Sequence, residues 1–185
     1  MTFVVTLYDA VFGLIERIGD WVLPLLARFV IAATLLFYYW NSGLTKIGDG
    51  PLGIFNPSAG AYMQIFPRQM EAVSYDASQL SSLHWLVVVC GTWAEFLLPA
   101  LIVLGLMTRV AAFGMIGFVV MQSLTDVFGH GLTDARTLGA WFDRFPDSII
   151  MDQRLFWVFT LIYLVVRGAG AISLDTLLRR GRSRG

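Results

Sequence analysis

Residues 83–106 read LHWLVVVCGTWAEFLLPALIVLGL, an apolar run in which Glu95 is the only acidic or basic residue apart from His84. A run of this length and composition is typical of a helix that spans a lipid bilayer. An acid near the middle of the bilayer costs roughly 2.5–3.5 kcal/mol on insertion scales. We therefore expect Glu95 to be neutral or paired, and we take it as the main pointer to function.

Three further apolar runs, at residues 21–40, 110–128 and 155–172, match the first in character. Hydrophobic residues make up 57% of the chain and charged residues only 14%, whereas soluble domains have about 25% charged residues. The sequence predicts an all-α membrane protein, a bundle of four transmembrane helices in one domain over residues 1–185. Only residues 107–109 join the second and third spans, which predicts an antiparallel hairpin.

Composition excludes several classes of function. The formal net charge is zero and no basic patch is interleaved with aromatic residues, so we expect no nucleic-acid partner. Cys90 is the only cysteine and has neither a disulfide partner nor a CxxC motif. No iron–sulfur, haem or flavin motif is present, so the sequence encodes no cofactor and any electron carrier must be borrowed.

Both ends of the chain predict surface helices. Apolar residues recur at helical spacing over residues 1–19, which indicates an amphipathic helix on the membrane surface; the alternative is the first turns of a long first span. Near the other end, we expect Ser173 to cap a short surface helix over residues 174–180 and Asp175 to face its positive end.

Arginine distribution predicts the orientation. One side of the bundle holds Arg17, Arg109, Arg179, Arg180, Arg182 and Arg184, whereas the long connections 41–82 and 129–154 hold most of the acids. The positive-inside rule therefore predicts a multi-pass protein of a bacterial inner membrane with both termini in the cytoplasm. The first long connection contains many apolar residues, and we expect it to pack against the mouth of the bundle.

Depth along the helices suggests a partner for Glu95. At about 1.5 Å per residue, Arg28 lies roughly 10 Å from the cytoplasmic end of the first span, and its long stem could reach the level of Glu95. We predict a buried Arg28–Glu95 ion pair, since each charge alone would be costly in hydrocarbon. The pair could hold two helices together or could belong to a binding site, and the residues leave both roles open.

The helical faces predict a polar pocket in the outer half of the bundle. One stripe of the first span contains Arg28, Leu35, Tyr39, Gly43 and Lys46, and one stripe of the second contains Val88, Glu95 and Ile102. If these stripes face each other, the lining would be Tyr39, Asn41, Lys46, His84, Gln122, Asp126 and His130. Two histidines and an aspartate could ligate a metal, but we expect hydrogen bonding there and no metal.

Three blocks of sequence resemble the DoxX family of bacterial membrane proteins. The first is Arg28, an apolar run and then Gly43-Leu-Thr-Lys46. The second is Glu95 followed by Leu104-Gly-Leu-Met-Thr-Arg109, and the third is Gly168-Ala-Gly-Ala-Ile-Ser-Leu-Asp175. They occur in order over about residues 21–175, and the resemblance implies a four-helix inner-membrane protein.

The resemblance also implies a choice between two functions. The family name derives from a subunit of a thiosulfate:quinone oxidoreductase, other members are linked to oxidative-stress or thiol-redox complexes, and distant relatives are cargo receptors or assembly factors. We therefore expect a redox-associated membrane subunit with a quinone or small-molecule pocket, or a scaffold that recruits proteins without chemistry. In either case we expect the lipid bilayer and a membrane or periplasmic protein as partners. We do not expect the chain to be an enzyme on its own.

Overall fold

The computed structural model describes residues 2–182, and every regular element among them is helical. Four helical segments are long and apolar enough to cross a membrane: Thr2–Leu44, Ser82–Leu104, Thr108–Gly129 and Ile149–Arg167. The predicted all-α fold with four spans is therefore confirmed. Met1 and residues 183–185, including the Arg184 used for orientation, lie outside the described part of the chain.

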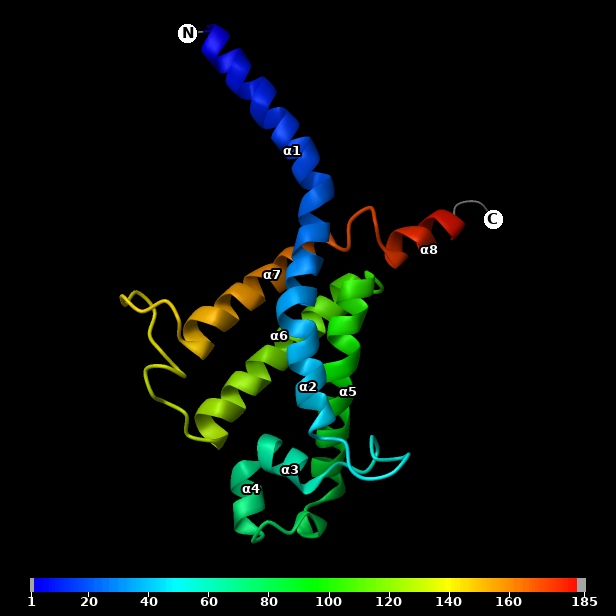
Figure 1. Cartoon of the computed structure of the whole chain (residues 1–185), viewed down its shortest axis with the longest axis vertical. Coiled ribbons are helices and arrows are strands. Elements are labelled where there is room, and N and C mark those ends of the chain that lie inside the picture. The colour runs from blue at the N-terminus through cyan, green and yellow to red at the C-terminus, as the bar shows by residue number, and fades with distance from the viewer. Residues whose placement is uncertain (1, 183–185) are drawn as a thin grey trace.

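The first span is one unbroken helix. It consists of α1 (Thr2–Ile31), a π-helical turn (Ala32–Leu36) and α2 (Phe37–Leu44). Residues 2–20 are helical as predicted, but they continue directly into the span, so they do not form a separate element. A helix of 43 residues is about 65 Å long, roughly twice the thickness of a bilayer core. The first half of α1 accordingly extends beyond the bundle (Figure 1).

The remaining spans form the body of the bundle. α5 (Ser82–Leu104) and α6 (Thr108–Leu124) are joined by the predicted short turn, and α6 continues as a π-helical turn, Thr125–Gly129. A π-helical turn, Ile149–Gln153, leads into α7 (Arg154–Arg167). α7 ends at Arg167 and not near residue 172, because Gly168 has a positive φ of 77° that stops the helix.

The core lies where the four spans meet. Its largest buried members are Ile31, Leu35 and Tyr39 from the first span, Ile102 from α5, Met115 and Val119 from α6, and Leu161 and Leu164 from α7. The two stripes predicted from the sequence thus face inward. Large apolar side chains such as Phe113 and Phe156 are exposed on the outside, as expected for surfaces that contact lipid.

The first long connection packs against the bundle, as predicted. It contains α3 (Ala59–Ile65), α4 (Pro67–Ala72) and a short 3-10 turn, Ala77–Gln79. Ala61, Tyr62 and Met70 are buried with Val88 of α5. α3 and α4 therefore cover one end of the bundle, which we call the α3/α4 end. α8 (Leu174–Arg182) and the N-terminus lie at the opposite end (Figure 1).

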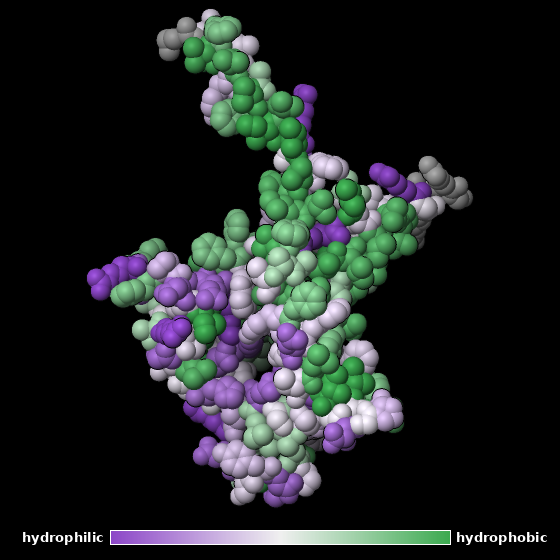
Figure 2. All heavy atoms as spheres, in the orientation of Figure 1, coloured by the Kyte–Doolittle hydropathy of each residue, from purple (hydrophilic) through white to green (hydrophobic). Residues whose placement is uncertain are grey.

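Hydrophobic and hydrophilic residues are distributed unevenly on the molecular surface. Hydrophobic residues predominate along α1, whereas hydrophilic residues gather over the α6–α7 connection (Figure 2). This division fits helices that lie in lipid and connections that lie at its edge.

Candidate functional site

Glu95 is paired with a lysine. Nζ of Lys46 lies 2.9 Å from Oε1 and 3.0 Å from Oε2 of Glu95, and both side chains are buried. The hydroxyl of Ser42 donates to Oε1 of Glu95 at 3.0 Å, and the Ser42 oxygen accepts a hydrogen bond from Nζ of Lys46 at 2.7 Å. The predicted Arg28–Glu95 pair is therefore wrong.

Helix length explains this correction. The first span was expected to end near Trp40, and Lys46 was placed on its stripe and in the pocket but not considered as the partner of Glu95. In the structure α2 extends to Leu44, and Lys46 lies in the turn that follows, from which its ammonium reaches the Glu95 carboxylate. The pair lies toward the α3/α4 end, where the sequence predicted the pocket.

Arg28 binds backbone carbonyls at the other end of the bundle. Its Nε donates to the carbonyl of Ile102 at 3.1 Å, and its Nη2 donates to that of Val103 at 2.6 Å. Its Nη1 donates to the carbonyls of Ala169 and Ile172, at 3.1 and 2.5 Å. The last carbonyls of a helix have no partner within the helix and carry partial negative charge. Arg28 therefore satisfies the end of α5 and ties it to the segment after α7.

Asp175 plays the matching role at the start of α6. Its carboxylate accepts hydrogen bonds from the backbone N–H groups of Met107 (2.7 Å) and Thr108 (3.0 Å). Ser173 caps α8 as predicted, with Oγ accepting from the N–H of Thr176. The expectation that Asp175 faces the positive end of its own helix is wrong, because its carboxylate faces that of α6. Burial alone would raise the pKa of Asp175, but the two amide hydrogen bonds outweigh it and hold the pKa below its ordinary range.

Gly105 lets these groups meet. It adopts φ +69°, and a Cβ atom there would lie 2.6 Å from Cβ of Ser173 and 2.9 Å from Cζ of Arg28. Only glycine combines this backbone conformation with such close neighbours. We call Arg28, Gly105, Ser173 and Asp175 the turn cluster. It brings together the three sequence blocks of the family resemblance, and its hydrogen bonds hold helix ends together.

A second group of polar side chains crosses the bundle beside the Lys46–Glu95 pair. The hydroxyl of Tyr39 is buried and donates to Oε1 of Gln122 at 3.0 Å, and Nε2 of Gln122 donates to the hydroxyl of Tyr38 at 3.0 Å. Tyr39 therefore connects the first span to α6.

Arg154 pairs with Asp126 at the start of α7. Its Nη2 donates to Oδ2 of Asp126 at 2.6 Å, and its Nη1 donates to Oγ of Ser123 at 2.8 Å. Arg154 is only 4% exposed, and its Nε atom has no hydrogen-bond partner. The sequence did not single out this residue, because Arg154 was counted with the charges of a connection. Its position immediately before an apolar span was the available signal.

The other predicted lining residues lie apart from this group. The half-buried His84 interacts with Ser81 through Nδ1 at 2.8 Å and packs against the ring of Phe66. The exposed His130 lies 3.0 Å from the carbonyl of Gln64 through Nε2, and Asn41 is exposed. Neither histidine therefore contacts the buried carboxylates. Within residues 2–182 no three His, Cys, Asp or Glu side chains are grouped to hold a metal ion.

These residues make up what we call the outer polar network, in which four are buried and Ser42, Gln122 and Asp126 are half-buried: Tyr39, Ser42, Lys46, Glu95, Gln122, Asp126 and Arg154. All four spans or their direct extensions contribute to it. Its carboxylates, ammonium and phenol are groups that hold and exchange protons. Burying such groups in the interior of a membrane protein costs free energy, and they commonly mark substrate or proton pathways there.

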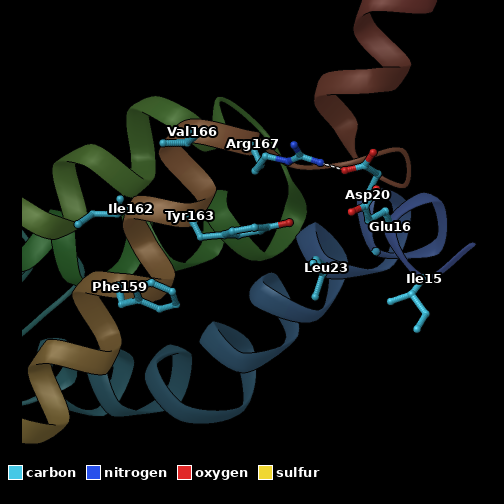
Figure 3. Close-up of a pocket in the computed structure, with 10 residues that line it drawn as sticks. Ile15, Glu16, Asp20, Leu23, Phe159, Ile162, Tyr163, Val166 and Arg167 are labelled. Carbon is cyan, nitrogen blue, oxygen red and sulfur yellow. Dashed lines mark hydrogen bonds and ion pairs between the residues drawn. The ribbon is translucent and has the colours of Figure 1, made fainter. Parts of the chain in front are cut away.

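Two cavities adjoin the bundle. The smaller, of about 240 Å³, lies between α6 and α7 and is lined by Ser123 and Arg154 among apolar side chains. The larger, of about 640 Å³, lies between α1 and α7 and is lined by Leu23, Phe159, Ile162 and Tyr163, with Asp20 and Arg167 forming an ion pair at its edge (Figure 3). Both cavities are thus mainly apolar, and neither is lined by the residues predicted for the pocket.

These features define the protein as a multi-pass helical membrane protein with a buried polar network at one end. The chain belongs to the DoxX family, whose family model matches residues 23–131. The matched segment contains the first two sequence blocks, and the third, at residues 168–175, lies beyond it. Comparison with curated proteins and with solved structures gave no match.

Proposed function

We propose that this protein is the membrane subunit of a redox complex in a bacterial inner membrane, and that its outer polar network exchanges protons with a quinone. Reduction of a quinone to a quinol takes up two electrons and two protons. In this proposal the partner oxidoreductase supplies the electrons, since the sequence encodes no cofactor motif. Glu95, Lys46 and Tyr39 are the groups of this chain that would relay the protons.

The observation that carries the proposal is the buried Lys46–Glu95 pair with its Ser42 contact. Removing two charges from water is expensive, and a buried ion pair often contributes little net stability. An apolar pair of similar volume would hold α2 and α5 together at lower cost. A carboxylate that is buried in a bundle with a lysine as its ion-pair partner and a serine hydroxyl as a donor is therefore better explained by proton exchange than by packing alone.

Purification of the complex in mild detergent tests this proposal. Partner proteins and bound quinone would be identified by mass spectrometry, and quinone-dependent electron transfer would be measured on the same preparation. We expect Glu95→Gln to keep the partner and to lower electron transfer at least tenfold. Glu71→Gln, on the exposed face of α4, is the matched control and should retain full activity. A complex with no oxidoreductase and no quinone would contradict the proposal.

The alternative function is a scaffold or assembly partner without chemistry. The first half of α1 favours it, because Phe3, Leu7 and Leu14 are each more than half exposed and extend away from the bundle. The larger cavity, between α1 and α7, continues this apolar surface (Figure 3). The hydroxyl of Tyr163, which lines that cavity, is buried and has no hydrogen-bond partner. Capture of secretion or assembly proteins in the same purification would favour this second function.

A further inference from the structure

The first half of α1 presents an apolar face that the bundle does not cover. α1 continues without interruption from Thr2 to Ile31, so this half forms one helix with the first span and extends beyond the bundle (Figure 1). Five apolar side chains follow one another at alternating intervals of three and four residues and are each 45–70% exposed: Val4, Leu7, Val11, Leu14 and Ile18. We call these five residues the α1 seam. None of them lines the cavity between α1 and α7.

The spacing of the α1 seam is that of a two-stranded coiled coil. In such a pair the a and d positions of a seven-residue repeat meet the partner helix, and β-branched residues at a with leucine at d favour parallel dimers. Valine or isoleucine occupies a at residues 4, 11 and 18, and leucine occupies d at residues 7 and 14. The acids of this half lie at c and f positions, on the far side of the helix, so like charges would not meet in the seam: Asp9, Glu16 and Asp20.

The repeat stops where α1 enters the bundle. The next a position is Leu25, which is still 36% exposed. The d position that follows it is Arg28, which is buried in the turn cluster. The seam pattern is thus confined to the part of α1 that the bundle does not cover.

The exposed area is sufficient for a stable pair. Phe3, Tyr8 and Ile15 flank the seam and are each more than half exposed. With roughly 60–120 Å² of apolar surface for each side chain, the seam and its flanking residues offer about 500–900 Å² in each copy, and a standard interface buries ~800 Å² per partner. Two copies in one membrane also share the same orientation and stay near each other, which favours parallel pairing of a short segment.

We propose that a second copy of this chain covers the α1 seam, so that the first halves of two α1 helices form a parallel coiled coil and the protein is a dimer. A two-fold axis along the membrane normal brings each seam residue opposite its own copy. The bilayer surface is the other occupant that such a face could have. It would require the helix to bend where it leaves the bundle, whereas α1 is unbroken through Gly19. The inference does not depend on the outer polar network.

Disulfide cross-linking in membranes tests the dimer. In the full-length protein with Cys90→Ala, Leu14→Cys places a thiol in the seam, and Glu16→Cys places one on the opposite face of the same turn. Copper phenanthroline would serve as the oxidant, and dimers would be quantified by non-reducing gel electrophoresis. We expect Leu14→Cys to form dimers at least tenfold faster than Glu16→Cys, because a parallel pair brings only seam residues next to their own copies. Leu7→Cys should behave like Leu14→Cys.

A second measurement separates stable pairing from chance collisions. Val11→Asp places two acids opposite each other in the seam, and we expect it to raise the dissociation constant of the dimer at least tenfold, measured by mass photometry in detergent. Gly13→Asp is the matched control: it adds the same charge at a c position with open space around it and should leave the dimer intact. Both positions lie outside the bundle, so both variants should fold normally.

Three outcomes would overturn the coiled coil. The first is equal, slow cross-linking at positions 14 and 16. The second is a monomer whose thiol in Leu14→Cys is protected from an impermeant maleimide by vesicles, which would place the seam on the bilayer surface. The third is a dimer that Val11→Asp does not weaken, which would place the interface elsewhere on the chain.

Discussion

At the scale of single residues, the buried charges have two kinds of partner. Lys46 and Glu95 neutralise each other, Arg154 is neutralised by Asp126, and Arg28 is bound only to backbone carbonyls. The difference matters because a carbonyl cannot titrate, whereas a carboxylate can. Arg28 therefore has a structural role at one end of the bundle, and the two ion pairs between buried or half-buried side chains lie toward the other end.

The Lys46–Glu95 pair leads to a prediction about protein stability at the scale of single residues. Lys46→Met leaves a buried carboxylate and Glu95→Leu leaves a buried ammonium, so each single change should destabilise the protein by about 3–5 kcal/mol. The double variant should recover most of that loss, because two apolar side chains need no partner. The free energy of unfolding of the wild type, the two single variants and the double variant would be measured in detergent, with tryptophan fluorescence as the signal. These four values form a double-mutant cycle.

Arg28→Met supplies the control for this cycle. Combined with Glu95→Leu it should show additive losses, within about 0.5 kcal/mol, since the two side chains share no contact. If Glu95→Leu instead recovered the stability that Arg28→Met loses, the result would support the Arg28–Glu95 ion pair predicted from the sequence. If the double Lys46/Glu95 variant folds normally yet loses quinone-dependent activity, the pair has a role beyond packing.

At the scale of elements, the short turn between α5 and α6 depends on distant segments. The end of α5 is satisfied by Arg28 of α1, and the start of α6 by Asp175 of α8. The N–H group of Asp175 also donates to the carbonyl of Gly105 at 2.8 Å. The antiparallel hairpin of α5 and α6 is thus fixed to the first and last helices at this single point.

Asp175 gives a pH prediction at this scale. Its pKa in the folded protein lies below that of an unfolded chain, so its stabilising contribution is complete above about pH 3.9. The contribution is lost as the pH falls through the depressed pKa of the folded state. Thermal unfolding from pH 7 to pH 3 should therefore show a drop in midpoint below about pH 4 that is smaller in Asp175→Asn.

Asp134 is the control for this pH profile. Hydrogen bonds from Thr137, with a further one from Arg136, also lower its pKa, but it lies in the exposed α6–α7 connection and ties no helices together. Asp134→Asn should leave the profile close to that of the wild type. A profile unchanged by Asp175→Asn would show that the carboxylate does not hold the start of α6.

At the scale of the whole molecule, the start of α1 and α8 both lie at the end of the bundle opposite α3 and α4 (Figure 1). This agrees with an even number of spans. The arginines of α8 lie at that same end, so the positive-inside rule predicts that it faces the cytoplasm.

Labelling of single cysteines in intact cells tests the orientation. In a Cys90→Ala background, an impermeant maleimide should label cysteine introduced at Gly60 or Ala140, which lie in the two long connections. It should not label Gly181→Cys, which lies in α8, until the cells are permeabilised. Labelling of position 181 in intact cells, with positions 60 and 140 protected, would reverse the predicted orientation.

The sequence by itself determined the number of spans, the inward faces of the first two spans and the cap of α8. These follow from local rules, because hydrophobic length, helical periodicity and a capping serine each act within a few turns of chain. The same rules placed Tyr39, Lys46, Glu95, Gln122 and Asp126 toward one end of the bundle.

Only the tertiary structure decided which charges meet. Counting residues by depth allowed Arg28 to reach Glu95, but it ignored the carbonyls of Ile102 and Val103 at the end of α5, which bind that arginine. It also ended the first helix near Trp40, about one turn before its end at Leu44, and did not consider Lys46 as the partner of Glu95. Arg154 was missed for a similar reason, since its partners Ser123 and Asp126 lie on another span. Such choices depend on competition among all polar groups within reach, and that competition exists only once the helices are packed.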